Sequence, residues 1–411
     1  MEINKVDILK IAIFSDTWLP NINGVTFSIL NQLKALSEHS EHELILFVPK
    51  TFSDKFEKIP DDVTVYESAG LVFPSYPGYI MSFPPVRSMK KIIKKEKRFD
   101  IIHTHSPFCQ GWYAMFYRKL LKCPMVTTFH THLPEYVGHL LMGLFEEKVK
   151  RVLYEPTWQI VRQQYNQYDA ILTPSKMMRR ELEQHGVKPV IDVPNSISPL
   201  FFQTEEAIRK KRAIAFRKRF NIPVDAKLLM YVGRIAFEKR LEVLLKAFKT
   251  LHERYDNLYL AIVGDGPQLG MYKNKARKLE LKDYVFTGYV HHRQLAGVYS
   301  AGDIFISPSD TETQGLTFIE SMSQGTPVIG VNSRGIADYV KNNQNGLLTQ
   351  TLKPDEFVKL ISYSLDNPEK LQTIIKNGHE TAKNYTYFGF KKRLMEAYSL
   401  GIKEWERKGN K

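Results

Sequence analysis

The chain has 411 residues, a length that predicts two domains of about 200 residues each. Its two cysteines, Cys109 and Cys123, argue against a disulfide-stapled secreted fold, and no run of about 20 apolar residues predicts a membrane-spanning helix. The net charge of +14 suits nucleic acid, anionic lipid or a phosphorylated compound as a partner.

Short runs rich in Ile, Leu and Val alternate with longer amphipathic segments in the first half. The runs are KIAIFSD, HELILFVP, IIHTHS, PMVTTFH, AILTPS and VIDVPN. The first of them has charged residues beside it, so it predicts a strand and not a signal peptide, which favours a cytoplasmic protein. This alternation predicts βαβ units and a parallel sheet that is buried on both faces.

Residues 86–99, VRSMKKIIKKEKRF, predict an amphipathic helix whose apolar side only Glu96 interrupts. The preceding segment FPSYPGYIMSFPP is predicted as a loop with several aromatic residues. Basic and aromatic side chains together suit the interface of an anionic membrane, although a sheet-packed helix with a wet basic face explains the same pattern. The expected membrane contacts are Lys90, Lys91, Lys94 and Lys95.

The segment VPNSISP separates the halves, and its Pro, Asn and Ser residues break both helix and strand. We place the domain boundary there, with domains of residues 1–196 and 197–386. The second half contains LLMYVG, LYLAIVG, YVFTG, DIFISPS, TPVIGV and NGLLT, which predict a second parallel sheet. Because open α/β sheets bind ligands at the carboxyl ends of their strands, a cleft between the two sheets is the expected site. The basic residues 209–212 and 217–219 are expected on a solvated helix face.

The second half contains the motif GRIAFEK. Gly233 ends a predicted strand, so Arg234 and Lys239 project from the carboxyl edge of the sheet. Two cations at that edge suit a diphosphate, helped by the dipole of the following helix. A surface Arg and Lys paired with Glu238 is the alternative explanation.

The motif ETQGLTFIE places two carboxylates eight positions apart. Glu312 follows a predicted strand, and Glu320 lies in a helix that begins near Gly315. Eight residues are slightly over two turns, so Glu320 lies on nearly the same face as the helix start. Carboxylates suit sugar or ribose hydroxyls, and the backbone N–H groups of the loop suit a phosphate. Two unrelated, exposed glutamates are the alternative.

In this order, GRIAFEK, GDGP at residues 264–267 and ETQGLTFIE resemble the retaining glycosyltransferases of family 4. Those enzymes have the GT-B fold, an α/β fold in which two Rossmann-like domains face each other across a cleft. In the first half, the Asn-Gly-Val of residues 23–25 is similar to the family's Gly-Gly-Val loop, and FHTHLPEY to its segment with an active-site histidine. VPNSISPLF resembles the interdomain connector. YTYFGFKKRLMEAY resembles the final helices, so residues 387–411 are expected to cross back onto the first domain.

The resemblance implies transfer of a hexosyl group, with retention, from a nucleotide sugar. The donor would bind the second domain and the acceptor the first. Arg234 and Lys239 would neutralise the donor diphosphate, Glu320 would hold the ribose, and Glu312 would contact the transferred sugar. Backbone contacts to the donor are expected from Gly24, Gly315 and Leu316.

FHTHLPEY resembles most the members that glycosylate lipids. This implies a membrane lipid acceptor such as diacylglycerol or a glycolipid, on a peripheral enzyme at the cytoplasmic face of the membrane. His130 would lie near the reacting carbon, with Asp16 and Tyr136 facing the acceptor hydroxyl. UDP-glucose is the donor that family frequency suggests. A soluble sugar or a protein is the alternative acceptor.

No cofactor or metal is expected. Asp310 opens no Asp-x-Asp motif, and the pairs His103–His105 and His130–His132 lack a flanking Cys or Asp to complete a zinc site. A nucleic-acid-binding protein is disfavoured because its usual motifs are missing. Asn23 replaces the first Gly of the family loop, and we expect it in the left-handed conformation that Asn tolerates.

Overall fold

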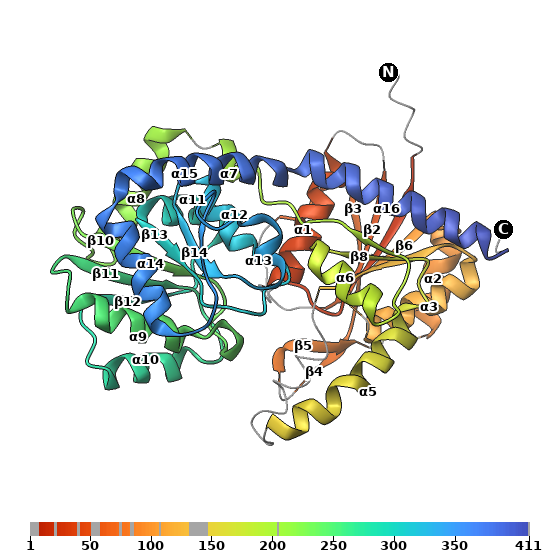
Figure 1. Cartoon of the computed structure of the whole chain (residues 1–411). Coiled ribbons are helices and arrows are strands. Elements are labelled where there is room, and N and C mark those ends of the chain that lie inside the picture. Colours follow the sequence, from red (N-terminus) through yellow and green to blue (C-terminus); the bar gives the residue numbers. More distant parts are fainter. Residues whose placement is uncertain are drawn as a thin grey trace. The chain divides into compact units, whose positions relative to one another are not determined.

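The structure is a computed structural model that describes residues 8–19, 23–38, 42–50, 58–73, 76–82, 86–106, 108–130, 147–203 and 205–409. The chain divides into two compact units, one of residues 1–196 with 387–411 and one of residues 197–386. Each unit contains one parallel sheet with helices on both faces (Figure 1). No helix within the described ranges is long and apolar enough to cross a membrane.

The sheet of the N-terminal unit has seven parallel strands in the order β3-β2-β1-β6-β7-β8-β9. Their bounds are β1 (Lys10–Phe14), β2 (Glu43–Pro49), β3 (Val63–Ser68), β6 (Ile101–Thr104), β7 (Met125–Thr128), β8 (Ala170–Thr173) and β9 (Val190–Asp192). The sequence pattern predicts six of them. It misses the edge strand β3, VTVYES, which is largely half-buried or exposed and therefore has no continuous apolar run.

Helices cover both faces of this sheet. On one face, α1 (Gly24–Ser37) and α16 (Tyr387–Arg407) pack in a common hydrophobic cluster with β1 and β2. On the other face lie α2 (Val86–Glu96) and α3 (Cys109–Leu121), while α5 (Glu147–Tyr165) and α6 (Lys176–Gln184) pack together beside β8. The C-terminal helix therefore completes the hydrophobic core of the N-terminal unit.

A hairpin of β4 (Gly70–Phe73) and β5 (Tyr76–Ser82) stands apart from the main sheet, and its strands pair antiparallel. The prediction of a loop here was wrong for the described residues. The Pro and Gly residues of this segment interrupt the apolar alternation by which a strand is normally recognised.

The sheet of the C-terminal unit has six parallel strands in the order β12-β11-β10-β13-β14-β15. Their bounds are β10 (Lys227–Val232), β11 (Leu258–Val263), β12 (Tyr284–Gly288), β13 (Ile304–Ile306), β14 (Val328–Val331) and β15 (Leu347–Thr349). Each comes from an apolar run in the sequence. Counted within the unit, the order is 3-2-1-4-5-6, the topology of the dinucleotide-binding fold.

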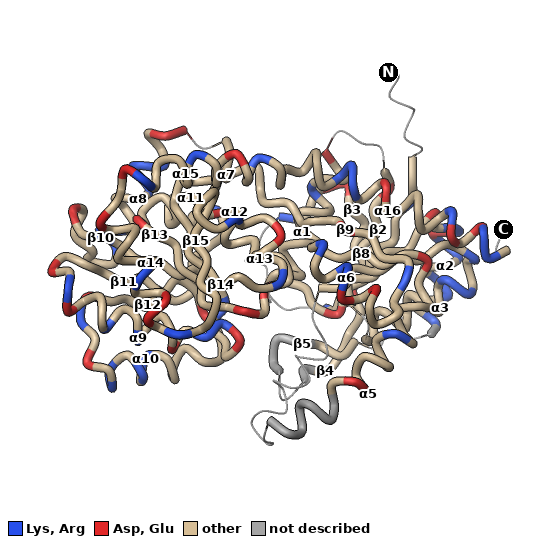
Figure 2. The backbone as a smooth tube through the Cα atoms, in the orientation of Figure 1, with Lys and Arg blue, Asp and Glu red and all other residues tan. Residues whose placement is uncertain are grey.

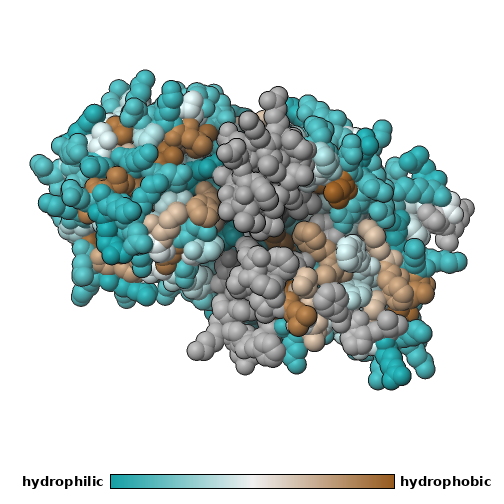
Figure 3. Space-filling model, turned by 90° about the horizontal axis from the view of Figure 1, so that it is seen from below, coloured by the Kyte–Doolittle hydropathy of each residue, from teal (hydrophilic) through white to brown (hydrophobic). Residues whose placement is uncertain are grey.

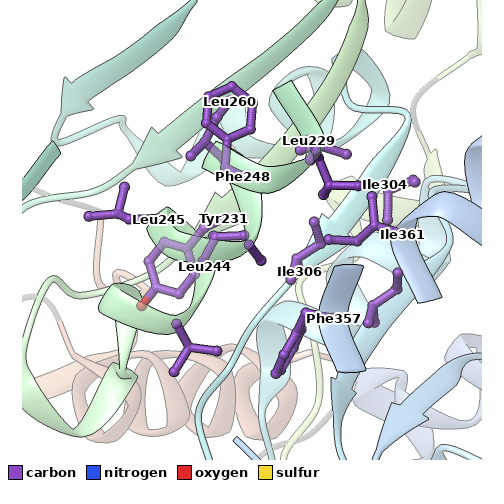
Figure 4. Close-up of a cluster of buried hydrophobic side chains, with 14 of the residues drawn as sticks. Leu229, Tyr231, Leu244, Leu245, Phe248, Leu260, Ile304, Ile306, Phe357 and Ile361 are labelled. Atoms are coloured by element: carbon purple, nitrogen blue, oxygen red, sulfur yellow. The ribbon is translucent and has the colours of Figure 1, made fainter. Parts of the chain in front are cut away.

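Two hydrophobic clusters hold the C-terminal sheet between its helices. On one side lie α9 (Leu241–His252), α10 (Leu269–Lys278) and α14 (Pro354–Asp366), and on the other α8 (Glu206–Arg219), α11 (His292–Ala301) and α12 (Leu316–Ser323). In Figure 4, Phe248 of α9 lies beside the sheet residue Leu260, and Leu244 of the same helix lies beside Tyr231 of β10. Each fully buried side chain of this kind contributes roughly 1.5–3 kcal/mol, which makes the sheet a rigid base for its loops.

One basic residue in α8 departs from the expected solvated face. Arg217 is only 8% exposed. Its guanidinium donates hydrogen bonds to the carbonyl oxygen of Ala301, at 3.0 and 2.7 Å, and forms an ion pair with Asp303 at 3.0 Å. Arg217 therefore fixes α8 to the end of α11 and to Asp303 after it, and the prediction was wrong for this residue.

Candidate functional site

The loops after β10 and β13 leave neighbouring strands of the C-terminal sheet. The helix that follows β10, α9, packs on one face, whereas the helix that follows β13, α12, packs on the other. The strand order therefore reverses between these two strands, and open α/β sheets bind ligands at such a switch point. The first loop carries Arg234 and Lys239, and the second carries Glu312.

Backbone contacts hold the loops after β10 and β11 together. Gly264 has φ +137, and a Cβ added there would lie 2.0 Å from the carbonyl oxygen of Gly233. The backbone N–H of Ile235 donates to the carbonyl of Asp265 at 2.9 Å. No larger residue fits at Gly264, so the GDGP motif sets the position of the loop that carries Arg234.

Lys239 and Glu312 form an ion pair between the two switch-point loops. Lys239 ends the short helical turn η1 (Phe237–Lys239), and its Nζ donates to Glu312 Oε1 at 2.7 Å. Burial alone would raise the pKa of Glu312, but the charge and hydrogen bond of Lys239, aided by Arg234, hold this pKa below its usual value. Glu312 is therefore an ionised acceptor at neutral pH.

Arg234 lies beside a carboxylate of its own loop. Its guanidinium donates to Glu238, four residues on, and the carbonyl oxygen of Arg234 accepts from the Tyr231 hydroxyl at 2.9 Å. The pairing with Glu238 that the sequence offered as an alternative is present. Arg234 lies two residues beyond the end of β10, and this ion pair is the contact that its guanidinium makes with Glu238.

The loop that carries Glu312 is fixed by α13 (Arg334–Tyr339). The backbone N–H of Gly335 donates to the Glu312 carbonyl at 3.1 Å, and the Tyr339 hydroxyl donates to the Gly315 carbonyl at 2.9 Å. Gly315 has φ +75 and precedes Leu316, the first residue of α12. The amide of Leu316 therefore opens a helix beside Glu312, a position that favours a negative ligand group.

Glu320 is buried at 8% exposure, on the inner part of α12. Its Oε2 accepts a hydrogen bond from the Tyr299 hydroxyl at 2.7 Å, and its Oε1 lies 3.8 Å from Nε2 of His292. The alternative of two exposed, unrelated glutamates is excluded. Sequence reasoning missed Tyr299, because a partner from a different helix leaves no local pattern.

In the N-terminal unit, three histidine rings lie in a row at the ends of β6 and β7. Ring centroids of His103 and His105 are 4.2 Å apart, and those of His105 and His130 are 5.1 Å apart. Nδ1 of His105 lies 2.8 Å from Nε2 of His130, so one ring donates to the other. Burial lowers the pKa of His103 and of His130 to about 3, and lowers that of His105 well below its usual value. All three rings are neutral at neutral pH.

The C-terminal helix contacts this histidine row. The Tyr398 hydroxyl of α16 lies 2.9 Å from Nδ1 of His103, and Thr128 Oγ1 lies 2.7 Å from its Nε2. Sequence reasoning set His103 and His105 aside as an incomplete zinc site. The described residues contain no group of three or more His, Cys, Asp or Glu that could hold a metal ion. The row is instead a hydrogen-bonded and stacked group.

Asp16 follows β1 and is only 1% exposed. Ser106 donates to its Oδ2, and the backbone N–H of Gln110 donates to its Oδ1 at 2.8 Å. The carboxylate therefore holds the first turn of α3, as anions at helix N-termini do. Contact of Asp16 with an acceptor stays a prediction. Tyr136 and His132 lie outside the described residues.

Asn23 and Gly24 begin α1. Asn23 has φ −148, so the expected left-handed conformation was wrong; its side chain instead accepts from the Thr26 backbone N–H at 3.0 Å as a helix cap. Gly24 is exposed, and an added Cβ would meet no atom of the protein within 4 Å. The fold itself therefore does not require glycine at this position. Close approach of a ligand to the backbone would explain the glycine.

The outer face of α2 carries the predicted lysines, all of them exposed. Met89 packs in the core on the opposite side. Glu96, which interrupts the apolar side, is 7% exposed, with its Oε2 at 2.8 Å from Nζ of Lys10 and its Oε1 bonded to the Tyr66 hydroxyl. The helix therefore packs on the sheet and keeps its basic face outside, as both sequence explanations require. Figure 2 shows the lysines and arginines of α2 in blue.

Comparison with known proteins identifies the family. Residues 22–199 match the family model described as Glycosyltransferase Family 4, and residues 213–381 match Glycosyl transferases group 1. The chain is 32% identical over 347 residues to the α-monoglucosyldiacylglycerol synthase of Streptococcus pneumoniae, covering 83% of this chain and 75% of that protein. The chain belongs to glycosyltransferase family 4. The resemblance noted in the sequence is confirmed, and the protein is a glycosyltransferase.

Two further similarities bear on donor and fold. This family 4 chain is 27% identical to a GDP-mannose-dependent α-mannosyltransferase of Corynebacterium glutamicum, over 95% of this chain and 89% of that protein. Alr3699/HepE of Anabaena, solved in complex with UDP and glucose, superposes with a TM-score of 0.74 at 15% identity, covering 95% of this chain and 99% of that one. The predicted GT-B fold with two Rossmann-like domains is confirmed.

Proposed function

We propose that this glycosyltransferase moves a hexosyl group, with retention, from UDP-glucose to a membrane lipid such as diacylglycerol or a glycolipid. The observation that carries the proposal is the Lys239–Glu312 pair, which sets a cation and an ionised carboxylate 2.7 Å apart at the switch point of the C-terminal sheet. The lipid acceptor is supported by the 32% identical relative, which is an α-monoglucosyldiacylglycerol synthase.

The donor roles follow from charge. Arg234 and Lys239 bind the diphosphate, which carries more negative charge than either carboxylate that now pairs with them. Once Lys239 turns to the diphosphate, Glu312 is free to accept hydrogen bonds from hydroxyls of the transferred sugar. Glu320 holds the ribose. Backbone groups of Gly24, Gly315 and Leu316 approach the donor.

Retention is proposed to occur by attack from the face of the leaving group. The bond from the anomeric carbon to the diphosphate oxygen breaks while the acceptor hydroxyl oxygen bonds to that carbon, and the departing diphosphate oxygen takes the hydroxyl proton. Arg234 and Lys239 stabilise the charge that develops on the leaving group. His130 is neutral, since its pKa is about 3, so it adds no positive charge beside the electron-poor carbon. Replacing His130 with Ala should lower kcat, and wild-type turnover would remove it from this role.

The basic face of α2 is proposed to hold the enzyme on the cytoplasmic face of an anionic membrane. Each basic residue near such a surface contributes about 1 kcal/mol to membrane binding. Added salt screens this attraction and weakens it. A variant in which all four lysines are changed to Glu should no longer co-sediment with anionic vesicles at low salt. These lysines are Lys90, Lys91, Lys94 and Lys95. Unchanged binding would exclude this face as the contact.

The test of function crosses donors with acceptors. Purified protein is incubated with UDP-glucose, GDP-mannose or ADP-glucose, and with diacylglycerol vesicles, a glycolipid or soluble sugars; products are identified by mass spectrometry and the anomeric configuration by NMR. We expect an α-glucosyl lipid from UDP-glucose. The GDP-mannose arm is required because a mannosyltransferase is 27% identical. Transfer to soluble sugars or protein alone would overturn the lipid acceptor, and a β product would overturn retention.

The same assay in EDTA tests the diphosphate site. Arg234, Lys239 and the start of α12 supply the positive charge that other transferases take from a divalent cation, so activity should survive the chelator. Complete loss in EDTA, restored by manganese, would contradict this account of the leaving-group charge.

A further inference from the structure

The outer face of α3 carries a line of large hydrophobic side chains. Trp112, Phe116 and Leu120 are 65%, 37% and 52% exposed. They recur every four residues, so they share one side of the helix. Ala114 and Tyr117 on its other side are buried against the sheet, so these three side chains are not needed for the core. We call them the α3 stripe. Figure 3 shows hydrophobic surface, in brown, among hydrophilic surface on the described atoms of one face.

The surroundings of the α3 stripe are basic. Helices α2 and α3 share one hydrophobic cluster on the same side of the sheet, so their outer faces belong to one surface of the N-terminal unit. Exposed cations on and beside these helices are Arg87, Lys90, Lys91, Lys94, Lys95, Lys97, Arg98, Lys119 and Lys122.

Helices α2 and α3 and the described chain between them carry no exposed carboxylate. Across residues 86–106 and 108–122 the acidic residues are Glu96 and Asp100. Glu96 is buried against Lys10. Asp100 accepts from the Lys10 backbone N–H at 2.7 Å, and its side chain is 23% exposed. Cations that surround exposed aromatic and aliphatic groups, without competing carboxylates, match the chemistry of an anionic bilayer surface.

We propose that the α3 stripe inserts into the interface of an anionic bilayer while the cations of α2 and α3 bind lipid phosphates. This inference rests on the lipid acceptor of the proposed function. Trp at position 112 suits the headgroup level, where an amphipathic ring keeps its N–H in water. A second copy of the chain is a poorer occupant, because pairing two such faces brings their cations together.

Docking along α3 would bring the bilayer to the helix whose first turn is bonded to Asp16, a candidate acceptor residue. The first turn of α3 is bonded to Asp16 through the backbone N–H of Gln110, at 2.8 Å, and through Ser106. The first turn of the helix that meets the lipid is therefore bonded to the residue predicted to face the acceptor hydroxyl.

Tryptophan fluorescence tests insertion directly. Trp18 and Trp158 are 4% and 2% exposed, whereas Trp112 is 65% exposed, and Trp405 stacks on Arg118. Vesicles of phosphatidylglycerol with brominated phosphatidylcholine should quench Trp112 in the wild-type protein. Trp112→Phe should bind the vesicles equally well, because Phe is also a large apolar side chain. It should lose most of the quenching, because the fluorescent Trp112 is absent.

A triple variant tests the energetic contribution of the stripe. Replacing Trp112, Phe116 and Leu120 with Ser should lower partitioning onto these vesicles by roughly tenfold or more at physiological salt, where screening weakens the basic face. The matched control replaces Ile214, Val224 and Met271 with Ser; these are 51%, 66% and 39% exposed in the C-terminal unit, and their loss should leave binding unchanged. Far-UV circular dichroism and the thermal shift with UDP-glucose verify folding of both variants.

Wild-type partitioning of the stripe variant, or absence of quenching in a vesicle-bound wild-type protein, would overturn the inference. So would a wild-type dimer that the triple substitution converts to a monomer in sedimentation. A water-soluble short-chain diacylglycerol separates this inference from the proposed function. The stripe variant should keep its turnover on that acceptor and lose it on vesicles. Quenching of Trp112 without sugar transfer to any lipid would overturn only the proposed function. Sugar transfer to a lipid without quenching of Trp112 would overturn only the insertion of the α3 stripe.

Discussion

Individual charges in the C-terminal unit are already balanced by neighbours before any donor binds. Lys239 pairs with Glu312, and Arg234 pairs with Glu238, all on loops at strand ends. Pairing keeps these partly buried ions from standing alone, which would be costly. It also fixes the positions of both cations. Under the proposed function, donor binding would exchange these carboxylates for the diphosphate.

Replacing Lys239 with Ala should weaken nucleotide-sugar binding by roughly 1.5–3 kcal/mol, or about 10- to 150-fold, because one charge-assisted contact with the diphosphate is lost. Isothermal titration with UDP-glucose measures the change. Lys246→Ala provides the control, since Lys246 is an exposed cation on the neighbouring helix α9. Equal affinity of Lys239→Ala and wild type would show that the donor diphosphate lies elsewhere.

Replacing Glu320 with Ala should also weaken donor binding by roughly 1.5–3 kcal/mol, through loss of the ribose contact. The same substitution leaves the buried Tyr299 hydroxyl without its 2.7 Å acceptor, which lowers stability as well. Tyr299→Phe separates the two effects, because it removes that hydrogen bond and keeps the carboxylate. Tyr299→Phe should retain most of the affinity; a loss as large as that of Glu320→Ala would mean that Glu320 acts only in the fold.

The histidine row should make the N-terminal unit sensitive to acid. His103 and His130 bind a proton only near pH 3 in the folded protein, compared with about 6.5 when unfolded. Between these pH values the unfolded state binds more protons than the folded state. The contribution of these histidines to the free energy of unfolding is therefore fully present above pH 6.5 and is lost as the pH falls toward 3. The slope is up to about 1.4 kcal/mol per pH unit for each histidine.

Urea unfolding at pH 7.5, 6.5, 5.8 and 5.0 measures this slope above the range in which carboxylates titrate. His130→Gln is neutral at every pH, so its slope should be smaller than that of the wild type by one proton. An identical slope would show that His130 binds its proton over the same pH range in the folded and the unfolded protein.

At the scale of elements, the sequence predicts strands where burial on both faces produces a continuous apolar run, as in β10 and β11. It fails where an edge strand is half exposed, as in β3, and where Pro and Gly interrupt the hairpin of β4 and β5. It also misses tertiary roles of charged residues. Nothing near Arg217 in the sequence indicates that the Ala301 carbonyl will accept from it.

In the candidate site too, local motifs reveal some residues, whereas partners that are distant in sequence are missed. Motifs predicted Arg234, Lys239 and Glu312, because these residues lie close to strand ends that apolar runs reveal. Their supports are distant in sequence: Tyr339 bonds the Gly315 carbonyl, and Tyr398 approaches His103 from 295 positions away. Such contacts depend on how the helices pack, and no local pattern encodes them.

The loop between β13 and α12 should depend on Gly315. Its φ of +75 disfavours any residue with a Cβ, and that Cβ would lie 2.4 Å from Cδ1 of Ile336. Gly315→Ala should therefore destabilise the protein by about 1–3 kcal/mol and weaken donor binding, as thermal unfolding with and without UDP-glucose would show. Gly270→Ala is the control, because an added Cβ there meets no atom within 4 Å, and it should be neutral or stabilising. Equal effects of the two substitutions would contradict this role of Gly315.

Across the whole chain, the C-terminal unit is one continuous segment, whereas the N-terminal unit is assembled from both ends of the sequence. Helix α16 supplies Phe390, Leu394 and Tyr398 to the cluster that includes β1 and β2. Each contributes roughly 1.5–3 kcal/mol of burial, and together they approach the entire stability of a typical domain, about 5–15 kcal/mol. The N-terminal unit should therefore depend on residues 387–407.

A chain that ends at Thr386 should consequently lose the cooperative unfolding transition of the N-terminal unit and keep that of residues 197–386. Differential scanning calorimetry would then show one transition where the full chain shows two, and a separately expressed protein of residues 197–386 identifies the remaining one. Loss of Tyr398 also removes the hydroxyl that lies 2.9 Å from Nδ1 of His103, so sugar transfer should be lost with the fold. The C-terminal transition serves as the internal control. Two undiminished transitions in the shortened chain would show that α16 is dispensable to the N-terminal core, and that the buried contacts of Leu394 and Tyr398 contribute little to its stability.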